Sequence, residues 1–184
     1  MHDDELAVDV SALLAPWADA LGSDRAGYTN HVIRVLLHCD ALYARAGGTG
    51  EPPSRQLEYR VTGVFHDLGI WTDQTFDYLV PSIDLAAVYL EAQERDDLLP
   101  LITEMIDKHH KQRPAGPADD PVEIFRRADA IDVSLGLRRF GLGIGHARAV
   151  FRAYPSRGFH RTLIRLTTKR TIEHPTSPLP MFKW

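Results

Sequence analysis

The stretch Val64-Phe65-His66-Asp67-Leu68-Gly69 places a histidine and an aspartate within an apolar segment. At about 100° per residue on a helix, Gly63, His66 and Asp67 fall together on one side. The other side holds large apolar residues at helical spacing: Leu57, Val61, Val64, Phe65 and Leu68. The pattern predicts a helix over roughly 54–68, ended by Gly69, a residue suited to a helix C-terminus. Its polar side either lines an internal site or faces solvent.

Helical periodicity continues through most of the chain, and alternating β-branched runs bounded by hairpin turns are missing. Asp120-Pro121-Val122-Glu123 marks a helix start, because the aspartate can cap the helix and proline suits the first helical position. We therefore expect an all-α fold. The predicted helices are 8–21 (ended by Gly22), 27–46, 54–68, one from Pro81, one from Pro100 to His110, one from Asp120, 146–154 and 158–172.

A chain of 184 residues suffices for one domain with a substantial core, and no internal boundary interrupts it. We predict a compact single-domain helical bundle over 1–184. The core motifs occupy 27–140, and C-terminal helices with an extended proline-rich tail occupy 141–184. Met181, Phe182 and Trp184 are expected to hold this tail on the body of the domain.

The composition excludes several classes of protein. With 21 lysines and arginines against 25 acids, the net charge of −4 gives no global field that attracts nucleic acid or an anionic membrane. No apolar run approaches the ~18 residues that span a bilayer, and the acidic start lacks the basic flank of a signal peptide. Cys39 is the single cysteine, so no intrachain disulfide can form. We expect a cytoplasmic protein that binds neither membranes nor nucleic-acid polymers.

Polar residues that can ligate a metal lie on or beside the apolar faces of the other predicted helices. His31 and Arg34 flank the core stripe of 27–46, where Arg34 can meet an anionic ligand or an internal carboxylate. His109 projects from the middle of an apolar face, and His110 sits at its edge. A metal, a phosphate or a backbone carbonyl would each satisfy a buried His109.

Two aspartates, Asp129 and Asp132, share an apolar helix face three residues apart. Carboxylates on such a face are rarely left unpaired. The nearby arginines fall mostly on other faces, so the pattern favours a metal or a histidine from another helix as partner of at least one aspartate. Four separate helices thus direct histidine or aspartate inward, and a shared divalent transition metal explains them together.

Two local motifs and their order resemble the HD domain superfamily of metal-dependent phosphohydrolases. The motifs are Tyr28-Thr29-Asn30-His31-Val32-Ile33-Arg34-Val35 and Val64-Phe65-His66-Asp67-Leu68-Gly69, followed by Ala128-Asp129. The resemblance covers roughly 27–140. It implies an α-helical fold of the HD type and a divalent ion held by His31, His66, Asp67 and Asp129. His109-His110 resembles the additional histidines that in some members hold a second metal and in others face the substrate.

The chain also departs from familiar branches of that family. Three residues after Asp67, where certain hydrolases carry a lysine or glutamate, this chain has Ile70, followed by Trp71 and Thr72. The subfamily is therefore left open.

We predict a metal-dependent phosphohydrolase acting on a nucleotide or another small phosphorylated metabolite. The metal is Mn, Fe, Co, Ni, Zn or Mg, as one ion or two. Asp67 would orient the attacking water or accept its proton, and His109 is the second candidate catalytic residue. Arg34, His110 and Lys111 are the candidates for binding substrate oxygens.

Two alternatives stay open. Relatives of the superfamily include hydratases and di-iron oxygenases, and the available histidines and aspartates suffice for two irons. The other alternative is a non-catalytic binding module, in which a buried His-Asp network only holds helices together. Assembly into a homo-oligomer is also left open.

Overall fold

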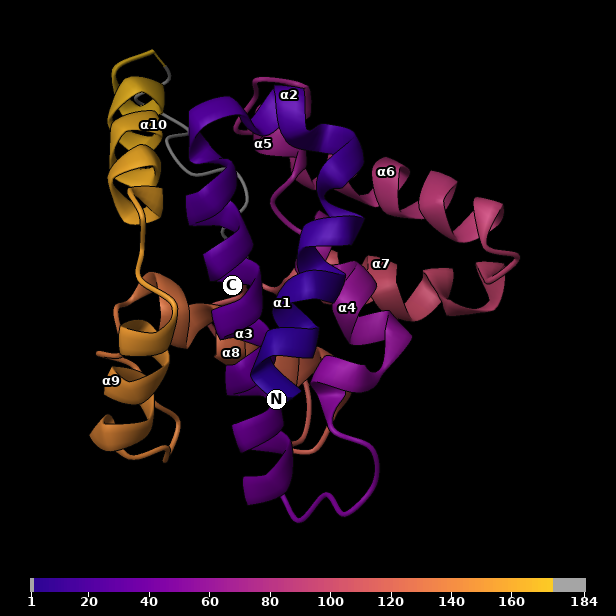
Figure 1. Ribbon diagram of the computed structural model, residues 1–184, viewed down its shortest axis with the longest axis vertical. Helices are drawn as coiled ribbons and strands as arrows, with labels where there is room; N and C mark the ends of the chain where they lie inside the picture. The colour runs from indigo at the N-terminus through magenta and orange to yellow at the C-terminus, as the bar shows by residue number, and fades with distance from the viewer. Residues whose placement is uncertain (1, 174–184) are drawn as a thin grey trace.

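The computed structural model describes residues 2–173, and in that range every regular element is helical (Figure 1). The all-α prediction is confirmed. The longer helices are α1 (His2–Leu13), α3 (Arg25–Arg45), α4 (Leu57–Phe65), α6 (Leu79–Ala92), α7 (Leu99–Lys108), α8 (Pro121–Val133), α9 (Ile144–Ala153) and α10 (Phe159–Glu173). Short elements connect them: η1 (Ala15–Trp17), α2 (Ala18–Leu21), η2 (Gly22–Asp24), η3 (Pro53–Arg55), α5 (Gly69–Thr72) and η4 (Asp96–Leu98).

The predicted tail at 174–184, with Met181, Phe182 and Trp184, lies outside the described residues. None of the helices within 2–173 combines the length and the apolar character needed to cross a membrane.

Helix α3 forms the axis of the bundle. It packs along α8 and also contacts α1, α4, α9 and α10, while α6 and α7 project to one side (Figure 1). Apolar residues such as Val32, Leu36 and Cys39 are fully buried on it. Because neighbours cover α3 on several sides, its flanking polar residues His31, Arg34 and His38 are buried too. Each of these must find a partner inside the protein.

Some helix boundaries agree with the sequence signals and others differ. The Asp120 side chain caps α8 by accepting the backbone N–H of Val122 at 2.8 Å, as predicted. The predicted helix 8–21 instead begins at His2 and is broken into α1, η1 and α2 around Pro16, because proline lacks the N–H that an interior helix position donates. Helix α7 ends at Lys108 rather than at His110.

Gly69 does not end a helix, contrary to expectation, but begins α5 directly after the His-Asp pair. Its backbone N–H donates to Ser82 Oγ at 3.1 Å, and a Cβ on Gly69 would lie 2.7 Å from the carbonyl oxygen of Tyr78. Glycine is therefore required here by the close approach of the segment that opens α6. This contact fixes where α4 delivers His66 and Asp67.

Replacing Gly69 by alanine should lower the free energy of unfolding by ~1–3 kcal/mol, because the new methyl group meets a backbone oxygen that cannot move aside freely. Urea denaturation measures the change. Gly145→Ala is the matched control, since nothing lies within 4 Å of a Cβ at this position in α9. It should leave the protein as stable or stabilise it by about 0.4–1 kcal/mol. Equal effects at the two glycines would contradict the packing explanation.

Candidate metal centre

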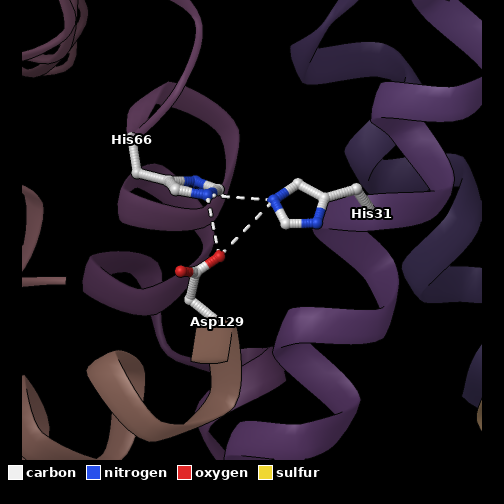
Figure 2. A group of neighbouring side chains, drawn as sticks. All are labelled: His31, His66 and Asp129. Carbon is white, nitrogen blue, oxygen red and sulfur yellow. Dashed lines mark hydrogen bonds and ion pairs between the residues drawn. The ribbon is translucent and has the colours of Figure 1, made fainter. Parts of the chain in front are cut away.

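The four residues predicted as metal ligands lie together in the structure. His31 comes from α3, His66 from the end of α4 and Asp129 from α8, and their polar ends converge (Figure 2). The Nε2 atoms of His31 and His66 are 3.0 Å apart, and Asp129 Oδ1 lies 3.8 Å from each of them. Asp67 Oδ2 lies 3.8 Å from His31 Nε2 and 3.5 Å from His66 Nε2. All four side chains are buried.

The pair His109-His110 lies on the other side of the same carboxylates. His109 Nε2 is 3.4 Å from Asp67 Oδ1, and His110 Nδ1 is 3.7 Å from Asp129 Oδ2. Each aspartate therefore turns one oxygen toward His31 and His66 and its other oxygen toward His109 or His110. The donor atoms fall into three overlapping groups: His31 with His66 and Asp129, His66 with Asp67 and His109, and His109 with His110 and Asp129.

Hydrogen bonds at Nδ1 fix the orientation and the protonated nitrogen of three of these imidazoles. The Nδ1 of His66 lies 2.9 Å from Gly63 O and that of His109 lies 2.6 Å from Ile106 O. A carbonyl only accepts, so Nδ1 carries the proton in both rings. His31 Nδ1 likewise donates to the Asp132 carboxylate at 2.7 Å. The Nε2 lone pairs are thus directed into the cluster, as outer hydrogen bonds direct them in metal sites.

Several buried polar atoms of the cluster have no hydrogen-bond partner within residues 2–173. They are Asp67 Oδ1, His109 Nε2 and both carboxylate oxygens of Asp129. Leaving such groups unpaired away from water is costly, and two Nε2 atoms 3.0 Å apart repel each other unless a proton or a cation lies between them. A mixed set of imidazoles and carboxylates suits divalent Mn, Fe, Co, Ni or Zn. The described residues therefore fit a metal ion.

In the metal-free cluster, a proton on His66 takes the place of a cation. Burial disfavours the charged imidazolium of His66, but the carboxylates of Asp67 and Asp129 outweigh this and raise its pKa to about 9. Burial acts to raise the pKa of Asp67 and of Asp129, and the surrounding histidines reverse this and hold both below the usual range. Both aspartates are therefore ionised at neutral pH and available as ligands.

Metal binding at neutral pH should release a proton from His66, because only the deprotonated imidazole ligates and the metal-free ring has a pKa of about 9. The apparent affinity should rise with pH and level off above that value. Calorimetric titration of Zn²⁺ or Mn²⁺ in two buffers of different ionisation enthalpy counts the protons. His38→Asn is the control, since the pKa of this buried histidine is lowered to about 4 by burial and it is neutral beforehand. Metal uptake without proton release would contradict the assignment.

A cavity of about 340 Å³ opens onto the second side of the cluster. Asp67, His109, His110 and Asp129 belong to its lining, so two of the predicted ligands and both members of the histidine pair are within reach of a small molecule. Lys111 lines the cavity as predicted. The rest of the wall combines apolar residues with a few polar ones: Ile70, Phe76, Tyr78, Ala130, Val133, Leu163, Gln112, Ser134, Arg138 and Thr167.

Tyr78 is the site residue that the sequence did not reveal. Its hydroxyl lies 2.6 Å from His110 Nε2 and so fixes the orientation of that ring on the cavity wall. Tyr78 is buried just before α6, in a segment without a regular pattern, and no local signal marks it.

Arg34 lies behind the cluster and is not among the residues that line the cavity. Its Nε and Nη2 donate to the two oxygens of Asp132 at 2.5 and 2.9 Å, and Nη1 donates to Tyr154 O at 3.0 Å. Of the two partners considered for Arg34, the internal carboxylate is the one observed. Asp132 thereby joins Arg34 to His31 Nδ1, and these hydrogen bonds, acting against burial, lower its pKa.

Comparisons of this chain with protein-family models, with curated proteins and with solved structures find no match. Functional assignment therefore depends on the motifs and on the geometry of the site.

Proposed function

We propose that the protein is a metal-dependent phosphohydrolase of the HD type that acts on a nucleotide or another small phosphorylated metabolite. The observation that carries the proposal is the set of buried carboxylate and imidazole atoms at the inner end of an open cavity that find no hydrogen bond among the described residues. In a purely structural His-Asp network we would expect hydrogen bonds to satisfy every member, whereas here four atoms of the cluster have none among the described residues. The order of the motifs around His31, His66-Asp67 and Asp129 supports the same assignment.

His31, His66, Asp67 and Asp129 would hold the ion, and His109 and His110 face the other oxygens of the same carboxylates. A divalent ion bound there would lower the pKa of a water and polarise a phosphoryl oxygen. Asp67 lies between the buried histidines His31 and His66 and the cavity. Its oxygen on the cavity side can therefore orient the attacking water and accept its proton. His109, His110 and Lys111 line the cavity and would bind substrate oxygens, with Arg138 as an additional cation.

We assign Arg34 a different role from the substrate contact predicted for it. Its guanidinium donates hydrogen bonds to Asp132 and to Tyr154 O, and its side chain is fully buried. It acts as a positioning residue that holds Asp132 against His31.

The test is a phosphate-release screen over nucleotides and sugar phosphates, with the protein loaded in turn with Mn, Fe, Co, Ni, Zn or Mg. We expect at least one pairing of metal and substrate to release phosphate, and His66→Ala to abolish that release. His146→Ala is the control, because His146 is only half-buried and pairs with His38 outside the cluster. No release from any substrate by a fully loaded protein would overturn the proposal.

A di-iron oxygenase is the second candidate, and the two-sided use of Asp67 and Asp129 favours it. Carboxylates that face two groups of histidines suit a pair of ions. Two irons in each chain, with oxygen uptake that depends on substrate, would select this reaction over hydrolysis.

A further inference from the structure

Positive charge is concentrated in one part of the chain, although the protein as a whole is slightly acidic. Between 134 and 173 there are nine lysines and arginines and a single acid, Glu173. This region comprises the turn after α8 and the helices α9 and α10. The net charge of −4 therefore conceals a basic region joined to a strongly acidic remainder.

Part of the acidic charge lies far from this basic region. Helices α9 and α10 follow one edge of the molecule, whereas the turn between α6 and α7 lies at the opposite edge (Figure 1). That turn exposes Glu94, Asp96 and Asp97, and α1 exposes Asp4 and Glu5. Exposed charges farther apart than about 8–10 Å are largely screened at physiological salt. An approaching surface at the α9–α10 edge therefore meets mainly positive charge.

Helix α10 presents an exposed face on which isoleucines alternate with cations. Ile164 is 67% and Ile172 is 76% exposed. Arg161, Arg165 and Lys169 are exposed on the same half of the helix, since they follow one another at four-residue spacing. The opposite half of α10 packs against the rest of the protein, where Phe159 and Thr162 are buried and Leu163 lines the cavity.

Most arginines of this edge have no ion-pair partner in the part of the chain that the structure describes. Among residues 2–173 no ion pair is formed by Arg148 and Arg152 of α9, by Arg157, or by Arg161 and Arg165 of α10. Arg170 is the exception, with Asp77 at 3.1 Å. The segment 174–184 contains no aspartate or glutamate. It adds Lys183 and four large apolar residues: Leu179, Met181, Phe182 and Trp184.

We infer that the α9–α10 edge docks the protein on the surface of an anionic lipid bilayer, an interaction independent of the proposed reaction. Cations attract the headgroups, and exposed isoleucines among them can be buried at the headgroup–acyl boundary, as in amphipathic helices that lie on membranes. A nucleic acid would use the arginines but would leave the isoleucines in water. The expectation that this protein has no membrane partner came from its net charge, and the segregation of charge removes that basis.

The test is co-sedimentation of the full chain with vesicles of phosphatidylcholine alone and of phosphatidylcholine mixed with phosphatidylserine. We expect binding only to the mixed vesicles, with weakening as salt is raised. Arg161→Glu/Arg165→Glu should reduce partitioning onto the mixed vesicles at least about tenfold, because each substitution replaces a cation that attracts the anionic headgroups by an anion that they repel. Ile164→Ser/Ile172→Ser should also reduce it with no change in net charge, which tests the apolar contribution separately.

Arg55→Glu/Arg95→Glu changes the net charge equally at exposed or partly exposed positions away from α9 and α10, and should leave binding unchanged. Thermal unfolding of every variant establishes that it is folded. Sedimentation with neither vesicle, equal loss in the control variant, or binding to single-stranded RNA that is insensitive to the isoleucine substitutions would each overturn the inference.

Discussion

Replacing Asp67 by asparagine should lower the affinity for a divalent ion by more than ~100-fold and abolish phosphate release. Mutation of a residue that only hydrogen-bonds to a metal ligand typically lowers metal affinity ~10- to 100-fold. Asp67 should have a larger effect, because its two oxygens face both groups of histidines. Asparagine keeps the shape of the side chain but loses the charge and replaces one oxygen by a donor amide. The measurements are metal content after dialysis, calorimetric titration and phosphate release.

Asp73→Asn is the matched control for this substitution. Asp73 lies six positions further along the chain, is exposed, and accepts only the hydroxyl of Thr72 among the hydrogen bonds resolved for its side chain. It removes the same formal charge and should change neither affinity nor activity. Full retention of metal by the Asp67 variant would refute the proposed centre.

Replacing Asp132 by alanine should lower the free energy of unfolding by ~3–5 kcal/mol, because it leaves the guanidinium of Arg34 buried without its carboxylate. Urea denaturation of the metal-free protein measures this without a contribution from bound metal. Asp97→Ala, which breaks the exposed pair with Arg95, is the control and should have little effect.

A double variant separates the structural role of Asp132 from its role toward the metal. Arg34→Met/Asp132→Leu removes both buried charges and should recover much of the lost stability, because apolar residues of similar volume often replace a buried pair without penalty. It should still bind metal ~10- to 100-fold more weakly, since His31 Nδ1 has lost its acceptor. Normal metal affinity in this variant would show that Asp132 does not position His31.

The buried pair of Arg34 and Asp132 also makes the free energy of unfolding depend on pH in the acidic range. The pKa of Asp132 is held below its ordinary value of about 3.9, so the folded state binds this proton less readily than the unfolded state. Its contribution is complete at neutral pH and is lost as the pH falls below about 4. The double variant should therefore lose less stability than the wild type when both are acidified.

Prediction from the sequence was most accurate for residues of a metal-ligating type that helical periodicity places on an inward-facing side of a helix. His31, His66, Asp67 and Asp129 all lie in one cluster, and His109 faces the same carboxylates. The capped start at Asp120 was also predictable, because a cap is a local interaction between residues close in sequence. The break of the first helix near Pro16 and the role of Gly69 were not predicted, and the requirement for glycine at position 69 comes from Tyr78 in another segment.

The residue types and their helical faces are properties of the sequence itself, and they determined that imidazoles and carboxylates would point inward from separate helices. Tertiary structure alone decided that Arg34 pairs with Asp132, that Tyr78 contacts His110, and that α9 and α10 of the basic segment lie along one edge, opposite the turn between α6 and α7. The physical reason is that helical phase fixes a direction around one helix axis, whereas partners on different helices depend on how those axes pack.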